Sequence, residues 1–118
     1  MNKQTIILDA VRSPIGLKNG KLIGIRPDDL SAKVLKVLLE RNSTIDHKYI
    51  EDVVIGCAFP EGSQGFLMAR GVSIMAGLPK ETGGKVVNRL CGLFARAFCI
   101  ICSEPGIFLN AGVSVTPA

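Results

Sequence analysis

The order of hydrophobic and polar positions along the chain predicts an α/β fold. Apolar residues run on without alternation at Thr5–Val11 and Val53–Cys57, as they do in strands buried on both faces of a parallel sheet. A third, shorter run with two β-branched valines lies at Lys85–Asn88. Helical patterns at Pro27–Asn42 and Phe66–Ala76 separate these runs, and an apolar, helix-like segment follows the third. The order β-α-β-α-β-α predicts a mainly parallel sheet with crossover helices.

The first predicted helix begins at Pro27 and ends near Asn42. Proline and the two acidic residues that follow it suit the first turn of a helix, where the helix dipole is positive. Leu30, Val34 and Leu38 recur at helical spacing and form one apolar stripe. We therefore expect this stripe to pack against the sheet.

Cys91 stands at the corner between the third predicted strand and the apolar segment that follows it. Backbone N–H groups at the start of a helix are unpaired, and together with the dipole they favour the thiolate over the thiol. In an open α/β sheet the site lies at the carboxyl ends of the strands, and Cys91 comes just past one of them. The local sequence makes Cys91 a candidate nucleophile, and the alternative at this point is a small buried hydrophobic residue.

Composition narrows the classes of protein and of partner. With 118 residues the chain forms one domain at most, and a hydrophobic content of 47% excludes a disordered chain. Aromatic residues make up 5% and tryptophan is absent, which argues against base stacking on single-stranded nucleic acid. The net charge is +4, but the basic residues are scattered, which favours a solvated helix face over a nucleic-acid patch. No nucleic-acid partner is predicted.

The pattern predicts neither a membrane protein nor an exported one. The first apolar run is too short for a signal peptide, and the longest apolar stretch, Leu93–Cys102, carries Arg96. Four cysteines without an export signal suggest a reducing, cytoplasmic setting. Cys99 and Cys102 have CxxC spacing, but there is no second pair and His47 lies far upstream, so no metal site is predicted.

The segment Asn88–Gly92, with the sequence Asn-Arg-Leu-Cys-Gly, resembles the nucleophilic-cysteine motif of the thiolases, which are acetyl-CoA acyltransferases and acetyltransferases. Further segments resemble other motifs of that family and follow in the family's order: Asp9–Gly16, Asp28–Leu30, Gly56–Pro60, Gln64–Phe66, Ala69–Arg70 and Ala76–Pro79. The resemblance is collinear from about Thr5 to Gly92. Several short motifs in one order are far more specific than any one of them.

The resemblance implies an incomplete thiolase-like N-terminal domain with acyltransferase chemistry. In this family the motif cysteine, here Cys91, attacks the keto carbon of a 3-oxoacyl-CoA and holds the acyl group as a thioester. A second coenzyme A then removes that group, and the steps reverse for condensation. Acyl-CoA and coenzyme A are therefore the expected substrates. No permanently bound cofactor is expected, no cofactor-binding residue is assigned, and full-length relatives are expected to be homo-oligomers.

By the same resemblance, Cys91 is the only catalytic position that this sequence matches. The family's activating histidine, in a Gly-His-Pro context, and its acid/base cysteine, in a Cys-x-Gly context, lie in a second half. His47 sits on the polar approach to a strand and is expected at the surface. Cys57 ends a predicted strand and is expected in the core, while Cys99 and Cys102 match no motif.

After Gly92 the resemblance stops, and Leu93 and Phe94 stand where the family has small residues. We therefore expect two parts, a partial thiolase N-terminal domain at residues 1–92 and an unmatched tail at residues 93–118. A frameshift, a gene-model error or genuine divergence would each produce such a break. The favoured function is a truncated thiolase N-terminal domain. The alternatives are a catalytically inert fragment that acts as a dimerising or binding module, and a related condensing enzyme of the ketoacyl-synthase type.

Overall fold

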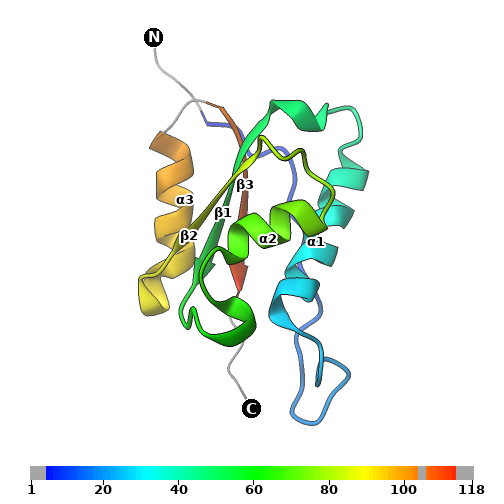
Figure 1. The fold of residues 1–118 in the computed structure, drawn as a ribbon, viewed down its shortest axis with the longest axis vertical. Coiled ribbons are helices and arrows are strands. Elements are labelled where there is room, and N and C mark those ends of the chain that lie inside the picture. The colour runs from blue at the N-terminus through cyan, green and yellow to red at the C-terminus, as the bar shows by residue number, and fades with distance from the viewer. Residues whose placement is uncertain (1–4, 104–105, 114–118) are drawn as a thin grey trace.

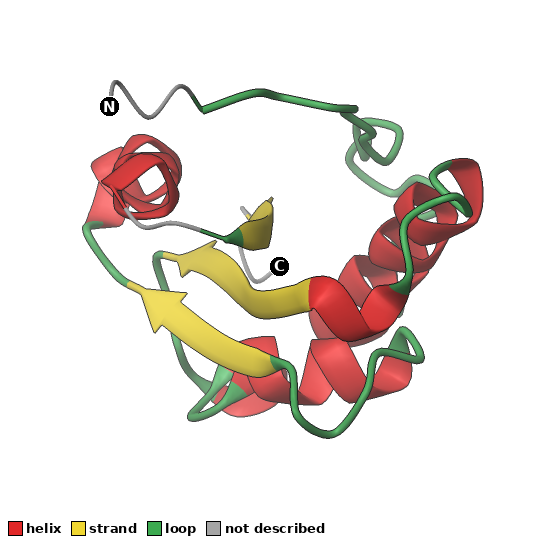
Figure 2. Ribbon diagram, turned by 90° about the horizontal axis from the view of Figure 1, so that it is seen from above, coloured by secondary structure: helices red, strands yellow, loops and turns green. Residues whose placement is uncertain are grey.

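The computed structural model describes residues 5–103 and 106–113, which form a parallel sheet with helices on both faces. Along the chain the elements are α1 (Pro27–Arg41), β1 (Ile50–Cys57), α2 (Met68–Met75), β2 (Gly83–Val87), α3 (Leu93–Ser103) and β3 (Ile107–Val113). The strands lie in the order β2-β1-β3, and both neighbouring pairs are parallel. Figures 1 and 2 show α3 on one face of the sheet and α2 on the other, with α1 beside α2. The predicted α/β class with a parallel sheet is confirmed.

β1 forms the centre of the core because helices cover both of its faces. Val53, Val54 and Ile55 are 0%, 1% and 0% exposed. A strand between two layers of helices exposes neither face, which explains why its apolar residues run on instead of alternating. The strand predicted at Val53–Cys57 is therefore confirmed, and the structure extends it back to Ile50.

α1 begins at Pro27, as the sequence predicts, and ends one residue before Asn42. Its buried residues are Ser31, Ala32, Leu35 and Leu39. The predicted stripe of Leu30, Val34 and Leu38 is only partly buried, because these side chains border a cleft beneath the N-terminal segment. The buried face of α1 is thus rotated away from the predicted stripe.

The N-terminal residues Thr5–Val11 form no strand, so the prediction of a buried first strand is wrong. Ile6, Ile7 and Leu8 are 74%, 67% and 65% exposed. Both sides of β1 are already occupied by β2 and β3, and the segment joins neither of these outer strands. It crosses over the sheet from α3 toward α1 (Figure 2). The order within the described residues is therefore α-β-α-β-α-β instead of the predicted β-α-β-α-β-α.

β3 lies in the part of the sequence where no strand was predicted. It pairs with β1 over its whole length, with Val53 opposite Leu109 and Ile55 opposite Ala111. α3 packs against β1 and β3 on one face of the same sheet. The described fold therefore continues past Gly92 as part of the same layered unit.

Asp9 ties the N-terminal segment to the end of α1. Its carboxylate accepts hydrogen bonds from Asn42 Nδ2 at 2.9 Å, from the Arg41 guanidinium at 3.1 Å and from the Ala10 N–H at 2.7 Å. The bond from Asn42, then the one from Ala10, lowers the pKa of Asp9 below its usual value of 3.8. A carboxyl group with a lowered pKa stabilises its contacts above the usual pKa, and this stabilisation is lost as the pH falls through the folded-state pKa.

We expect Asp9→Asn to free the N-terminal segment at neutral pH, because the amide carries no charge to attract Arg41. Backbone order parameters for residues 5–11, from nitrogen-15 relaxation, should fall below about 0.6 in this variant. The unchanged protein should show the same loss only at a pH below 3.8, where Asp9 becomes protonated in the folded state. Asp46→Asn, which removes the ion pair with Lys48 elsewhere on the surface, is the matched control and should leave residues 5–11 unaffected. Equal order in Asp9→Asn and the unchanged protein at pH 7 would contradict this role of Asp9.

Candidate active site

The corner that carries Cys91 is built by the end of β2. β2 and β1 run in parallel, with Val87 opposite Gly56 at their carboxyl ends. The chain then turns through a short 3-10 helix, η3 (Leu90–Gly92), and α3 begins at Leu93 (Figure 1). The backbone of Cys91 thus lies at the strand-to-helix corner that the sequence predicts, while its thiol lies outside the described part of the structure.

The turn into this corner is held by a side chain that the sequence analysis missed. Asn88 Oδ1 accepts a hydrogen bond from the Leu90 N–H at 3.1 Å, and the Gly92 N–H donates to the Arg89 carbonyl at 2.9 Å. Leu90 has a φ of 43°, in the left-handed region that residues with a Cβ rarely adopt. The signal in the sequence was the asparagine itself, because asparagine side chains commonly bond the backbone two residues on and so fix a turn.

α3 has cysteines near both of its ends. Cys91 precedes its first turn, whereas Cys99 and Cys102 lie in its second half and are exposed, free thiols. The positive end of a helix dipole favours a nearby thiolate, and the negative end disfavours one. Cys99 and Cys102 are therefore two exposed thiols on the same helix with which the reactivity of Cys91 can be compared.

Cys57 closes β1 inside the core, as the sequence predicts. Its side chain is fully buried, and the thiol donates to Gln64 Oε1 at 3.7 Å. Gln64 is itself only 8% exposed and ends the short 3-10 helix η2 (Gly62–Gln64). A thiol without access to solvent cannot receive a substrate, so Cys57 is a packing residue.

His47 lies at the amino ends of the strands, whereas Cys91 follows the carboxyl end of β2. His47 begins the 3-10 helix η1 (His47–Tyr49), which leads into the amino end of β1. Because β1 and β2 are parallel, the length of the sheet separates this edge from the corner after β2 (Figure 1). The structure therefore does not bring His47 to Cys91 as a general base.

Residues 5–103 and 106–113 contain no group of three or more histidine, cysteine, aspartate or glutamate side chains placed to hold a metal ion. Over the same residues, no helix combines the length and the apolar character that crossing a bilayer requires.

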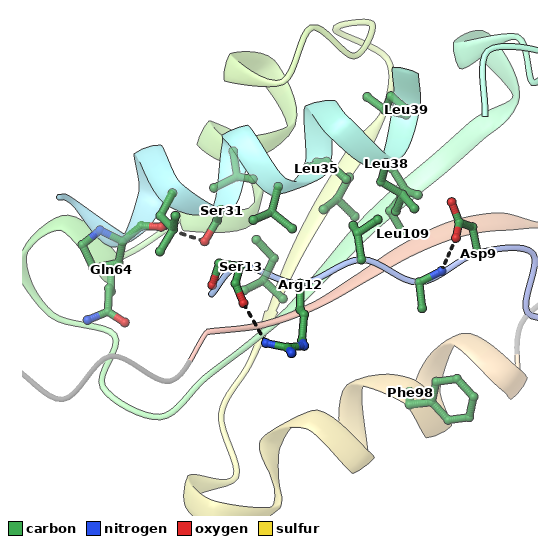
Figure 3. Close-up of a pocket in the computed structure, with 18 of the residues that line it drawn as sticks. Asp9, Arg12, Ser13, Ser31, Leu35, Leu38, Leu39, Gln64, Phe98 and Leu109 are labelled. Carbon is green, nitrogen blue, oxygen red and sulfur yellow. Dashed lines mark hydrogen bonds between the residues drawn. The ribbon is translucent and has the colours of Figure 1, made fainter. Parts of the chain in front are cut away.

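A cleft of about 2510 Å³ lies beneath the N-terminal segment. Figure 3 shows its walls, which include Leu35 and Leu38 of α1, Leu109 of β3 and Phe98 of α3, with Arg12 and Ser13 on the N-terminal side. Many of the lining side chains are apolar, and the described lining does not include the corner after β2. This cleft is the space left because residues 5–11 cross over the sheet instead of joining it. It is separate from the candidate site.

The matched family covers the corner and the elements that build it. The model of the family described as "Thiolase, N-terminal domain" matches residues 5–104. The chain belongs to the thiolase family. The match reaches beyond Gly92 through α3, so the thiolase resemblance extends further along the chain than the motifs alone indicate.

Individual thiolases agree with this assignment. A 3-ketoacyl-CoA thiolase of Marinomonas sp. (strain MWYL1) is 42% identical over 114 residues, which are 92% of this chain and 29% of that protein. A beta-ketoadipyl-CoA thiolase of Escherichia coli is 43% identical over 90 residues, which are 76% of this chain and 22% of that protein. The chain therefore spans less than a third of the length of either thiolase.

Solved thiolase structures have the same fold. The human mitochondrial 3-ketoacyl-CoA thiolase, determined in complex with CoA, superposes with a TM-score of 0.68 at 29% identity, over 78% of this chain and 23% of that one. The acetyl-CoA acetyltransferase from Syntrophomonas wolfei gives a TM-score of 0.68 at 30% identity, over 77% of this chain and 22% of that one.

Proposed function

We propose that this chain supplies the acyl-accepting thiol of a thiolase, and that Cys91 is that thiol. The observation that carries the proposal is the position of Cys91, just past the carboxyl end of β2 and two residues before α3, inside the region that the thiolase family model matches. Coenzyme A and acyl-CoA are the proposed substrates. This choice is supported by the names of the 3-ketoacyl-CoA thiolases to which the chain is similar and by the human relative solved with CoA.

In the proposed reaction the Cys91 thiolate attacks the keto carbon of a 3-oxoacyl-CoA. The bond between that carbon and C2 breaks, and acetyl-CoA leaves after its carbanion takes up a proton. The shortened acyl group remains on sulfur as a thioester until the thiol of a second coenzyme A displaces it. A thiol suits both steps because it attacks well as a thiolate and leaves readily again.

The first test is the relative reactivity of the cysteines. We expect limiting iodoacetamide near neutral pH to label Cys91 before the others, since an ordinary thiol with a pKa of about 8.5 is only a few per cent ionised there. Each unit by which the corner lowers the pKa of Cys91 raises its thiolate fraction up to about tenfold. Peptide mapping by mass spectrometry gives the order of labelling. Cys99 and Cys102 at the other end of α3 are the internal controls, and preferential labelling of either one contradicts the proposal.

A ketoacyl-synthase-type condensing enzyme receives less support than a thiolase. The matched family model is a thiolase model, and the similar proteins described above carry thiolase or acetyl-CoA acetyltransferase names. The inert binding fragment stays a prediction, as do the cytoplasmic setting and the homo-oligomer. The turnover measurement described in the Discussion separates an active chain from an inert one.

A further inference from the structure

We propose that Asn88 is a positioning residue for Cys91: its side-chain carbonyl holds the backbone turn that sets the path of the chain from β2 through Cys91 into α3. This inference rests on the proposed function of Cys91. It concerns a residue that touches no reacting atom and acts through the backbone of the turn.

The first observation is the hydrogen bond itself. Asn88 follows the last residue of β2, and its Oδ1 accepts from the Leu90 N–H at 3.1 Å. A bond from a side chain to the N–H two residues on closes a compact turn that mimics a backbone turn. It joins the end of β2 to the residue immediately before Cys91.

The second observation is the conformation of Leu90. Its φ of 43° is unfavourable for a residue with a Cβ. Its side chain is 61% exposed, so packing in the core does not hold the residue in this conformation. The described bonds that hold it are the one from its own N–H to Asn88 and the one from Gly92 to Arg89 across the same turn.

Together these observations link Asn88 to the direction in which Cys91 leaves the turn. Without the Asn88 acceptor, Leu90 relaxes toward negative φ, and the chain enters Cys91 along a different path. A changed path moves the backbone of Cys91 relative to the start of α3, where unpaired N–H groups favour a thiolate. An uncharged acceptor also suits this place, because a carboxylate three residues before Cys91 would oppose the ionisation of a thiol there.

The test is the pH dependence of Cys91 alkylation in the full chain. The rate constant with iodoacetamide, measured peptide by peptide over a range of pH, gives both the pKa of Cys91 and its limiting reactivity. We expect Asn88→Ala to slow labelling of Cys91 near neutral pH by about three- to thirtyfold, the range that corresponds to losing a side-chain cap. Asn88→Asp keeps an acceptor and should restore the limiting rate at high pH, but with a raised pKa.

Two controls separate positioning from general loss of structure. Asn19→Ala removes a different exposed asparagine, whose φ is 58°, from a turn far from Cys91 in the sequence, and should leave Cys91 unchanged. Labelling of the buried Cys57 reports global opening and should stay slow in every variant. If labelling of Cys57 becomes faster in Asn88→Ala while labelling of Cys91 becomes slower, the variant has lost structure generally. That result would overturn the positioning role.

Leu90→Gly gives a second, independent measurement. Glycine adopts positive φ without strain, so the turn no longer depends on the Asn88 bond to the same degree. Asn88→Ala should therefore slow Cys91 less in the Leu90→Gly background than in the unchanged protein. Two results overturn this inference while the proposed function stands. One is that Asn88→Ala slows Cys91 alkylation equally in both backgrounds, and the other is that it leaves the pH profile of Cys91 alkylation unchanged. If Cys91 of the unchanged protein is not the most reactive thiol, both proposals fall together.

Discussion

Mixed with acetoacetyl-CoA and coenzyme A, this 118-residue chain should consume no more than about one equivalent of substrate. A thiol can accept one acyl group, but sustained thiolysis also needs a base and donors for the oxyanion. The sequence has a single histidine, His47, and the structure places it at the edge of the sheet opposite the corner of Cys91. General acid–base catalysis contributes about 10²–10⁴ in rate and an oxyanion donor about 10²–10³, so turnover should fall by several orders of magnitude.

The measurement follows the loss of acetoacetyl-CoA at known chain concentration, beside the variant Cys91→Ala. We expect both proteins to lack steady turnover, and mass spectrometry to find any acetyl group of the unchanged chain on Cys91. His47→Ala should change nothing. Steady turnover that disappears in Cys91→Ala would contradict the prediction. If that turnover persisted in His47→Ala, the chain would assemble a complete site without His47.

The largest effect on stability is expected at Gly84, where β2 crosses α2. A Cβ added to Gly84 would lie 2.6 Å from Arg70 Cα and 2.9 Å from the Ala69 carbonyl carbon, and it would also overlap the Arg70 backbone nitrogen. These are backbone atoms that cannot rotate away, so α2 and β2 must separate. Overpacking usually costs about 1–3 kcal/mol, and we expect Gly84→Ala to lie at the upper end or beyond it, with Gly84→Val unable to fold.

Gly71 in the middle of α2 provides the matched control. It lies beside Arg70 in the sequence, yet a Cβ there would meet nothing within 4 Å. Gly71→Ala should therefore raise the free energy of unfolding by about 0.5–1 kcal/mol, because glycine weakens a helix. Urea unfolding followed by circular dichroism gives both values. If Gly84→Ala left the free energy of unfolding unchanged, α2 would not approach β2 as closely as the structure shows.

The sequence predicted the parts of the fold that depend on local patterns. The apolar run of β1 and the proline that starts α1 each carry their own signal, and both elements lie where they were expected. Thr5–Val11 has the same kind of signal as β1, but a pattern cannot tell which of several apolar segments gains a place beside β1. That competition is decided by β3, whose pairing with β1 is a property of the whole sheet.

The candidate site shows the same division between local and non-local information. Two β-branched residues, a polar corner and a following apolar segment are local, and they were enough to place the backbone of Cys91 between a strand and a helix. The hydrogen bond from the Leu90 N–H to Asn88 Oδ1 and the positive φ of Leu90 are details of this one turn. An asparagine in the sequence does not by itself predict either of them. The position of His47 depends on the direction of every strand, so only the fold could exclude it from the corner.

The unpaired segment at residues 5–11 also bears on how copies of this chain meet. It is rich in β-branched and apolar residues and is held to α1 through Asp9. Within residues 5–103 and 106–113, the outer strands β2 and β3 each pair on one side only. Each molecule therefore carries both an apolar segment that can serve as a strand donor and outer strands that can accept one. Reciprocal docking between two molecules closes a pair, and head-to-tail docking extends an open chain. A higher protein concentration and acid, which weakens the contacts of Asp9, both favour this strand exchange.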